Sequence, residues 1–203
     1  MAATYNNNKK SSSTFDKAFD LLMKFEGGYV YDPNDPGGET KYGISKRRYP
    51  DLDIKNLTID QAKELYRRDY WDKLNADKLP AKVAIFSLQC AVNNGVVRTA
   101  RMIQAAARHL SGYKLKLDGI IGPKSLKAIY HCNEDELVSE IATRQLLRYV
   151  RIIRNNPVLS KFIKGWFRRV VYSLKYALTC CDGESFERVT GNTEGYTFAR
   201  IVD

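Results

Sequence analysis

Several features that define common protein classes are missing from these 203 residues. No apolar run reaches the roughly 18 residues that a membrane-spanning helix requires. Only two histidines are present, which argues against a histidine-rich metal centre. The four cysteines have no paired metal-ligand spacing and two are adjacent, so buried or free thiols are favoured over a disulfide framework or a zinc site. We therefore expect neither a membrane span nor a metal.

Linkers and repeats are also missing. Between His109 and Asp118 only SGYKLKL intervenes, and no Pro/Gly/Ser-rich linker is present there. The first 13 residues and the segment 182–203 have the composition of tails. We expect a first region over 14–112 and a second helical region over 113–181, packed together as one folded unit.

The composition that remains is typical of a globular protein with a basic surface. Hydrophobic residues make up 44% of the chain, charged residues 28%, and the net charge is +10. The basic residues concentrate between Arg144 and Lys175. Such a surface suits nucleic acid, an anionic membrane or an anionic cell wall, or it is simply a solvated basic face. The aromatic and basic residues do not interleave in a recognised nucleic-acid motif, so we expect no nucleic-acid partner.

The pattern of apolar residues and caps predicts a mainly α fold. Ser13 or Thr14 can cap a first helix, and Thr58 with Gln61 fits a capping box. Pro123 suits the first turn of another helix. The expected helices are 14–25, 58–71, 81–92, 97–110, 123–130, 134–154 and 157–178. Only 29–46 has room for strands, and at most for a short hairpin.

The first helix ends on a carboxylate. Phe15, Phe19, Leu22 and Glu26 follow each other at intervals of four, three and four, which would continue the apolar stripe to Glu26. A partly desolvated carboxylate favours its neutral form, and a neutral carboxylic acid can protonate a leaving oxygen. The alternative is a glutamate at a frayed helix end that reaches water.

A turn-rich segment follows, and it supplies a second carboxylate. Asp35 and Thr40 flank a Pro-Gly-Gly turn that can bring the loop back over the helix end. Two carboxylates across a cleft are the minimum equipment for cleaving a glycosidic bond. Asp35 would stay ionised and, with Thr40, hold an attacking water. Asp32 and Glu39 are rival acids, and an Asx turn without chemistry is the structural alternative.

This segment resembles glycoside hydrolase family 108, whose hallmark is EGGY followed by DPGGxTxxGI. The sequence has EGGY from Glu26 to Tyr29 and DPGGETKYGI from Asp35 to Ile44. The order of acid, Asp and Thr also resembles phage-type lysozymes, although the interval from Asp to Thr is one residue shorter here.

Further segments resemble the same family. LYRRDYW (65–71) and AVNNG (91–95) are similar to its aromatic helix and its AVNxG turn, but Gln89 stands where relatives often have Asp. DGIIGPKSLKAI and FIKGWFRR (162–169) resemble the predicted peptidoglycan-binding region that accompanies the family. The resemblance covers about 15–178 and implies a lysozyme-like helical fold.

The resemblance implies an N-acetylmuramidase that cleaves the bond between N-acetylmuramic acid and N-acetylglucosamine without a metal or organic cofactor. The EGGY glutamate is the family's catalytic acid, which corresponds to Glu26; Asp35 and Thr40 would direct water or stabilise charge, with inversion by likeness to phage lysozymes. Further candidates to contact sugar are the aromatic residues Tyr29, Tyr42 and Tyr70 and the amide of Asn93. The alternative for the tyrosines is packing in the core, and the alternative for Asn93 is a cap at the end of a helix. Trp71 and Trp166 are expected in the core.

The expected partner is the glycan of peptidoglycan, and the expected state is a monomer unless the protein is part of a virion. The polar N-terminus lacks the apolar middle of a secretory signal. We therefore expect synthesis in the bacterial cytoplasm and delivery to the wall by a holin, a virion or a secretion machinery. Two other classes stay open: a non-catalytic wall-binding or virion structural protein, and a secretion-associated muramidase.

Overall fold

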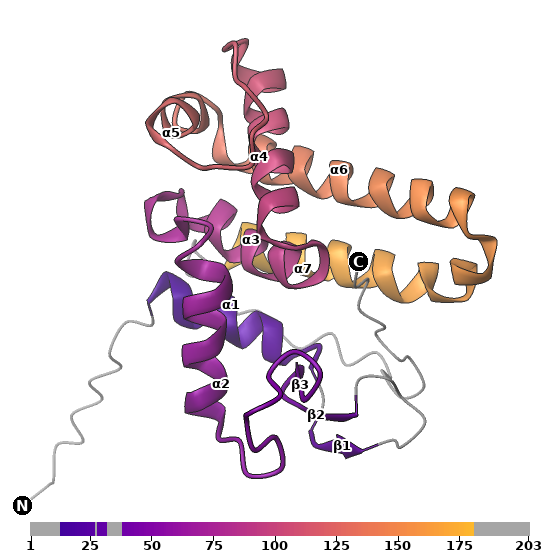
Figure 1. Ribbon diagram of the computed structural model, residues 1–203. Coiled ribbons are helices and arrows are strands. Elements are labelled where there is room, and N and C mark those ends of the chain that lie inside the picture. Colours follow the sequence, from indigo (N-terminus) through magenta and orange to yellow (C-terminus); the bar gives the residue numbers. More distant parts are fainter. Residues whose placement is uncertain (1–12, 27, 32–37, 181–203) are drawn as a thin grey trace, which may run out of the picture.

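The computed structural model describes residues 13–26, 28–31 and 38–180, and it confirms the mainly α fold (Figure 1). Short π and 3-10 segments are η1 (Arg67–Trp71), η2 (Ala76–Lys78) and η3 (Pro157–Phe162). The α-helices are α1 (Thr14–Met23), α2 (Ile59–Tyr66), α3 (Ala81–Asn94), α4 (Val96–Ser111), α5 (Pro123–Ile129), α6 (Glu134–Asn155) and α7 (Ile163–Thr179). None of the helices in the described ranges is long and apolar enough to span a membrane.

The helix α3 is the centre of the molecule. Every residue from Val83 to Asn94 is buried, as expected for a nearly continuous apolar run. The helices α1, α4, α6 and α7 all pack against it. One continuous hydrophobic core therefore extends from Phe15 to Ala177 and draws on both of the expected regions.

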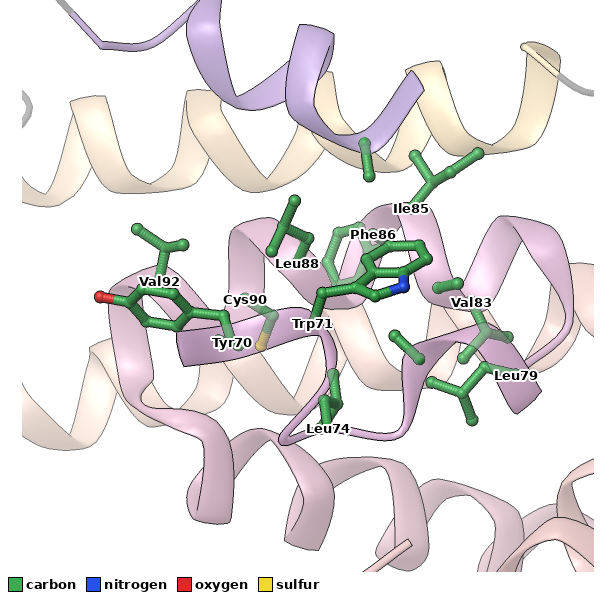
Figure 2. Close-up of a cluster of buried hydrophobic side chains, with 14 of the residues drawn as sticks. Tyr70, Trp71, Leu74, Leu79, Val83, Ile85, Phe86, Leu88, Cys90 and Val92 are labelled. Carbon is green, nitrogen blue, oxygen red and sulfur yellow. The ribbon is translucent and has the colours of Figure 1, made fainter. Parts of the chain in front are cut away.

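Figure 2 shows the aromatic part of this core, where Tyr70 and Trp71 lie among the side chains of α3. The Trp71 ring is 1% exposed and meets Phe15 edge-on at a centroid distance of 5.1 Å. Its Nε1 donates to Asp77 Oδ1 at 2.7 Å, so the one polar atom of the indole is satisfied. The expected core positions of Trp71 and of Trp166, which is 3% exposed, are confirmed.

Both predicted helix starts have capping boxes. Ser13 exchanges hydrogen bonds with Asp16 at the start of α1, and Thr58 does so with Gln61 at the start of α2. The α-helix expected to reach residue 71 ends at Tyr66 and continues as the π segment η1. In η1 the Asp72 N–H donates to the Arg67 carbonyl, five residues earlier.

The strands form a sheet with one strand more than the expected hairpin. The order is β1 (Val30–Tyr31), β2 (Glu39–Lys41) and β3 (Ile44–Ser45), both pairs antiparallel. Tyr42 and Gly43 join β2 to β3, and both have positive φ (50° and 71°), as a type I′ hairpin turn requires. Positive φ is uncommon for tyrosine, and the Tyr66 hydroxyl fixes this turn by donating to the Tyr42 carbonyl at 2.9 Å.

The C-terminal helix returns to the first helix. After α6, η3 reverses the chain, and α7 runs back beside α6 (Figure 1). Lys17 on α1 donates from Nζ to the Cys180 carbonyl just after α7, at 3.1 Å. The two ends of the described chain are therefore held together, while the sheet lies at the opposite end of the molecule from α5 (Figure 1).

A sheltered carboxylate, Asp69, gives the fold a pH dependence. Its side chain is 11% exposed and accepts hydrogen bonds from Arg68, Tyr49 and Lys73. The Arg68 guanidinium is the main cause that holds the pKa of Asp69 well below its usual range, and Tyr49 and Lys73 add to it. Burial, followed by the bond to Asp69, raises the pKa of Tyr49 to about 12. The ionised carboxylate is therefore the form that the fold prefers.

Replacing Asp69 by Asn should lower the free energy of unfolding by about 2 kcal/mol at pH 7. Because the folded-state pKa is lowered, this stability is complete above about pH 4 and is lost as the pH falls further. Urea unfolding at pH 7 and at pH 2.5 should therefore show a difference from wild type that shrinks in acid. The matched control is Asp72→Asn, whose side chain is 54% exposed. A constant difference at both pH values would contradict this role.

Candidate functional site

Glu26 follows the turn that closes α1, and does not lie at the end of the helix as expected. The helix ends at Met23, and the N–H groups of Lys24 and Phe25 close its last turn on the carbonyls of Leu21 and Leu22. The apolar stripe that precedes it is buried as predicted: Phe15, Phe19 and Leu22. Glu26 itself is half-buried. The carboxylate therefore lies where the core meets the surface, just before the chain enters β1.

The residues immediately before Glu26 are held by α7. The Phe25 ring meets the Tyr172 ring edge-on at a centroid distance of 5.4 Å. The Lys24 ammonium lies 4.8 Å from the centroid of the Tyr176 ring, a cation–π distance. The position of Glu26 therefore depends on the far end of the sequence.

A buried arginine lies beneath this turn. The Arg169 side chain on α7 is 2% exposed, and its Cζ is 5.8 Å from the centroid of the Phe25 ring. Its Nη1 donates to Asn93 Oδ1 near the end of α3. This contact joins α7 to α3, two helices far apart in sequence, beneath the segment that carries Glu26. A guanidinium buried this deeply is stabilised by such hydrogen bonds.

Sequence analysis missed the role of Arg169, although a signal was present. The residue lies between Trp166 and Val170 on the apolar stripe of α7, a stripe that continues to Ser173 and Ala177. A charged residue on a buried stripe indicates a specific partner.

Arg169→Met should lower the free energy of unfolding by about 2–3 kcal/mol, because it leaves the buried Asn93 oxygen without its donor. Urea unfolding measures this. Arg168→Met is the matched control, because Arg168 is the exposed neighbour on the same helix and should change stability by less than about 0.5 kcal/mol. Equal stability of the two variants would contradict the structural importance of the Arg169–Asn93 contact.

The sheet brings three of the polar candidates together. Thr40 pairs with Val30 and with Ser45, so it occupies the central strand. The Tyr29 hydroxyl donates to Glu39 Oε1 at 3.0 Å. Glu39, a rival acid, thus has a hydrogen-bond donor on its carboxylate. Asp35 and Asp32 lie outside the described residues, so the assignment of the second carboxylate stays a prediction.

The predicted sugar contacts differ in exposure. Tyr29 is 40% exposed, and Tyr42 is half-buried with the Lys41 ammonium 5.5 Å from its ring centroid. Tyr70 is 2% exposed under the Arg48 guanidinium, and Asn93 is 3% exposed. In this structure Tyr70 and Asn93 lie below the surface, whereas Tyr29 can be reached. A sugar contact by any of the four stays a prediction.

Gln89 is fully buried on α3, one turn before Asn93. Neither its amide nitrogen nor its amide oxygen has a hydrogen-bond partner within the part of the chain that the structure describes. The neutral amide avoids the larger cost that an ionised aspartate would incur at this depth.

The described residues offer no metal site, since no group of three or more His, Cys, Asp or Glu side chains among them could hold an ion. The cysteines in these ranges, Cys90, Cys132 and Cys180, are free thiols.

Comparisons with known proteins agree with this arrangement. A family model described as glycosyl hydrolase 108 matches residues 19–95, and one described as a predicted peptidoglycan domain matches 98–171. Among solved structures, that of Brucella abortus SagA matches with a TM-score of 0.67 and 32% sequence identity, over 81% of this chain and 94% of that chain. No match was found among curated proteins.

The two family models follow each other in the order that the sequence predicted, and the first contains Glu26 and the sheet. The solved relative extends the likeness over most of both chains. The chain therefore belongs to the glycosyl hydrolase 108 family, and at the level of that family it is a glycosidase that acts on peptidoglycan.

Proposed function

We propose that the protein is an N-acetylmuramidase in which Glu26 is the general acid. The observation that carries the proposal is the position of Glu26: it is half-buried, follows the turn that closes α1, and lies within the matched glycosidase region. Glu26 is the first residue of the EGGY motif, and the glutamate of the similar motif in the family is the catalytic acid.

In the proposed mechanism Glu26 protonates the glycosidic oxygen while an oxocarbenium-like transition state develops. Asp35, helped by the Thr40 hydroxyl, directs a water molecule or stabilises the developing charge. The likeness to phage lysozymes favours inversion. Tyr29, the most exposed of the four candidate contacts, would stack on a sugar ring.

Product analysis tests the bond specificity. Purified bacterial walls are incubated with the protein, and the soluble fragments are reduced with borohydride and analysed by mass spectrometry. Reduced muramic acid at the fragment ends is the expected result. Reduced glucosamine would instead indicate a glucosaminidase, and walls that bind the protein but stay intact would favour a non-catalytic wall-binding protein.

A separate proposal concerns how the protein reaches its substrate. We infer that the protein is made in the bacterial cytoplasm and reaches the wall with a holin, in a virion or through a secretion machinery. Phage lysis and virion-associated wall degradation are the roles that fit a muramidase delivered in this way, and a secretion-associated muramidase is the alternative.

A further inference from the structure

A cleft rich in arginine lies between α4 and α6, away from Glu26. Its volume is about 370 Å³, within the range of small-ligand sites. The arginines that line it are Arg98, Arg101, Arg144, Arg148 and Arg151, and Glu140 is the one acidic residue in its lining. We call this site the arginine cleft. Figure 1 shows α4 and α6 on the side of α3 that faces away from the sheet.

The arginine cleft follows from the spacing of its lining residues along the two helices α4 and α6. On α4, Arg98, Arg101 and Met102 fall on one stripe, with Ala105 one turn further on. On α6, the stripe begins at Glu140 and continues every three or four residues. Because α4 packs against α6, the two stripes face each other and their guanidinium groups gather in one hollow.

The protein satisfies only part of this positive charge. Arg98 Nη1 donates to the Asn94 carbonyl, and Arg148 Nε donates to Asn94 Oδ1 at 3.0 Å. Arg144 forms an ion pair with Glu140 at 2.7 Å. The Nε atom of Arg144 is buried and has no hydrogen-bond partner among the residues that the structure describes. Asn94 thus orients the guanidinium groups of Arg98 and Arg148, and Glu140 pairs with that of Arg144.

Two arginines of the cleft, Arg101 and Arg151, stand apart from these contacts. Within the described ranges, neither Arg101 nor Arg151 makes an ion pair or hydrogen bond of its side chain. Like charges held close together in a hollow repel each other and raise the local positive potential. An anion in the cleft would remove this repulsion, and guanidinium groups bind carboxylates through paired hydrogen bonds.

The remaining lining selects the kind of anion. Met102, Ala105 and Leu147 give the cleft an apolar part beside the arginines. A ligand that fits must therefore carry both carboxylates and small apolar groups. In peptidoglycan the N-acetylated glycan is uncharged apart from its attached peptides, and those peptide stems combine free carboxylates with the methyl groups of alanine.

We propose that the arginine cleft binds the carboxylates of peptidoglycan peptide stems. The cleft lies within residues 98–171, the stretch that matches the predicted peptidoglycan domain. The inference rests on the proposed function in that it takes peptidoglycan as the substrate. A stem held in the cleft and a glycan held near Glu26 would be two contacts with one polymer, so binding at the cleft raises the effective concentration of wall at the other site.

The test uses the full chain and three titrants in isothermal calorimetry. These are the N-acetylglucosaminyl-N-acetylmuramyl tetrapeptide, the same compound with its carboxylates amidated, and peptide-free glycan strands whose lactyl carboxylates are also amidated. The variant is Arg101→Gln with Arg151→Gln, because the substitutions break no side-chain hydrogen bond or ion pair with any residue that the structure describes. The matched control is Arg108→Gln with Arg154→Gln, which makes the same charge change at exposed positions of α4 and α6 outside the cleft.

The cleft variant should bind the free-carboxylate tetrapeptide at least about tenfold more weakly than wild type, and the control should stay close to wild type. Wild type should lose affinity to a similar degree for the amidated compound, while peptide-free glycan binding stays unchanged in the variant. Equal weakening in variant and control would overturn the proposal, and so would equal affinity for the amidated compound. A short DNA duplex is titrated in parallel; loss of its binding in the cleft variant, with the tetrapeptide unaffected, would assign the cleft to phosphate polymers instead.

The two proposals fail separately. A protein that releases reduced muramic acid from walls but does not bind the tetrapeptide would overturn the cleft assignment and leave the muramidase intact. A protein that binds the tetrapeptide through the cleft but leaves walls uncut would do the reverse.

Discussion

Replacing Glu26 by Gln should reduce hydrolysis of purified walls by at least ~10²-fold while the protein stays folded. The amide has nearly the same shape as the carboxyl group, but it cannot donate a proton to the glycosidic oxygen. Release of soluble fragments measures the rate, and thermal unfolding monitored by circular dichroism measures the fold. The reason to expect a large effect is the position of Glu26, which is half-buried after the turn that closes α1 and lies within the matched glycosidase region.

Glu64→Gln is the matched control, because Glu64 is an exposed glutamate on α2 and should tolerate the same change. Glu39→Gln tests the rival acid that the Tyr29 hydroxyl already binds. Activity of Glu26→Gln within about threefold of wild type would remove Glu26 from the mechanism. Loss of activity in Glu39→Gln alone would move the assignment to β2.

A fragment of residues 14–112 should lose both cooperative unfolding and wall hydrolysis, the latter by at least ~10²-fold. It lacks α6 and α7, which pack on α3, and would expose that buried helix to water. It also lacks Tyr172, Tyr176 and Arg169, whose contacts with Lys24 and Phe25 hold the turn before Glu26. Calorimetry and the wall assay measure the two effects.

A fragment of residues 14–180 is the control for this truncation, because it keeps α7 and the contact between Lys17 and the Cys180 carbonyl. It should unfold cooperatively and hydrolyse walls at a rate close to that of the full chain. A soluble 14–112 fragment with a sharp transition and full activity would show that the two regions are independent domains.

The elements that the sequence predicted well are those with a local cause. Ser13 and Thr58 begin helices because each has its capping partner three residues later, and Gly95 separates α3 from α4 with a positive φ of 82°. The burial of α3 follows from its largely apolar composition. The glycosidase motif was readable for the same reason, since its residues are contiguous.

The features that escaped prediction depend on distant contacts. The end of α1 at Met23 is set by a turn that packs on Tyr172, and no local signal marks it. The third strand forms because the Tyr66 hydroxyl supports a tight turn at Tyr42. Arg169 and the arginine cleft arise only when helices far apart in sequence meet.

The proton-donor role of Glu26 is tested most directly by changing the leaving group. Wild type and Glu26→Gln are compared on a glycan oligosaccharide of alternating N-acetylglucosamine and N-acetylmuramic acid and on the matching nitrophenyl glycoside of N-acetylmuramic acid, whose nitrophenolate leaves without protonation. The account predicts that the ~10²-fold loss seen with the glycan shrinks to less than about tenfold with the aryl glycoside. An equal loss on both substrates would contradict it, because the function of Glu26 would then not be to protonate the leaving oxygen.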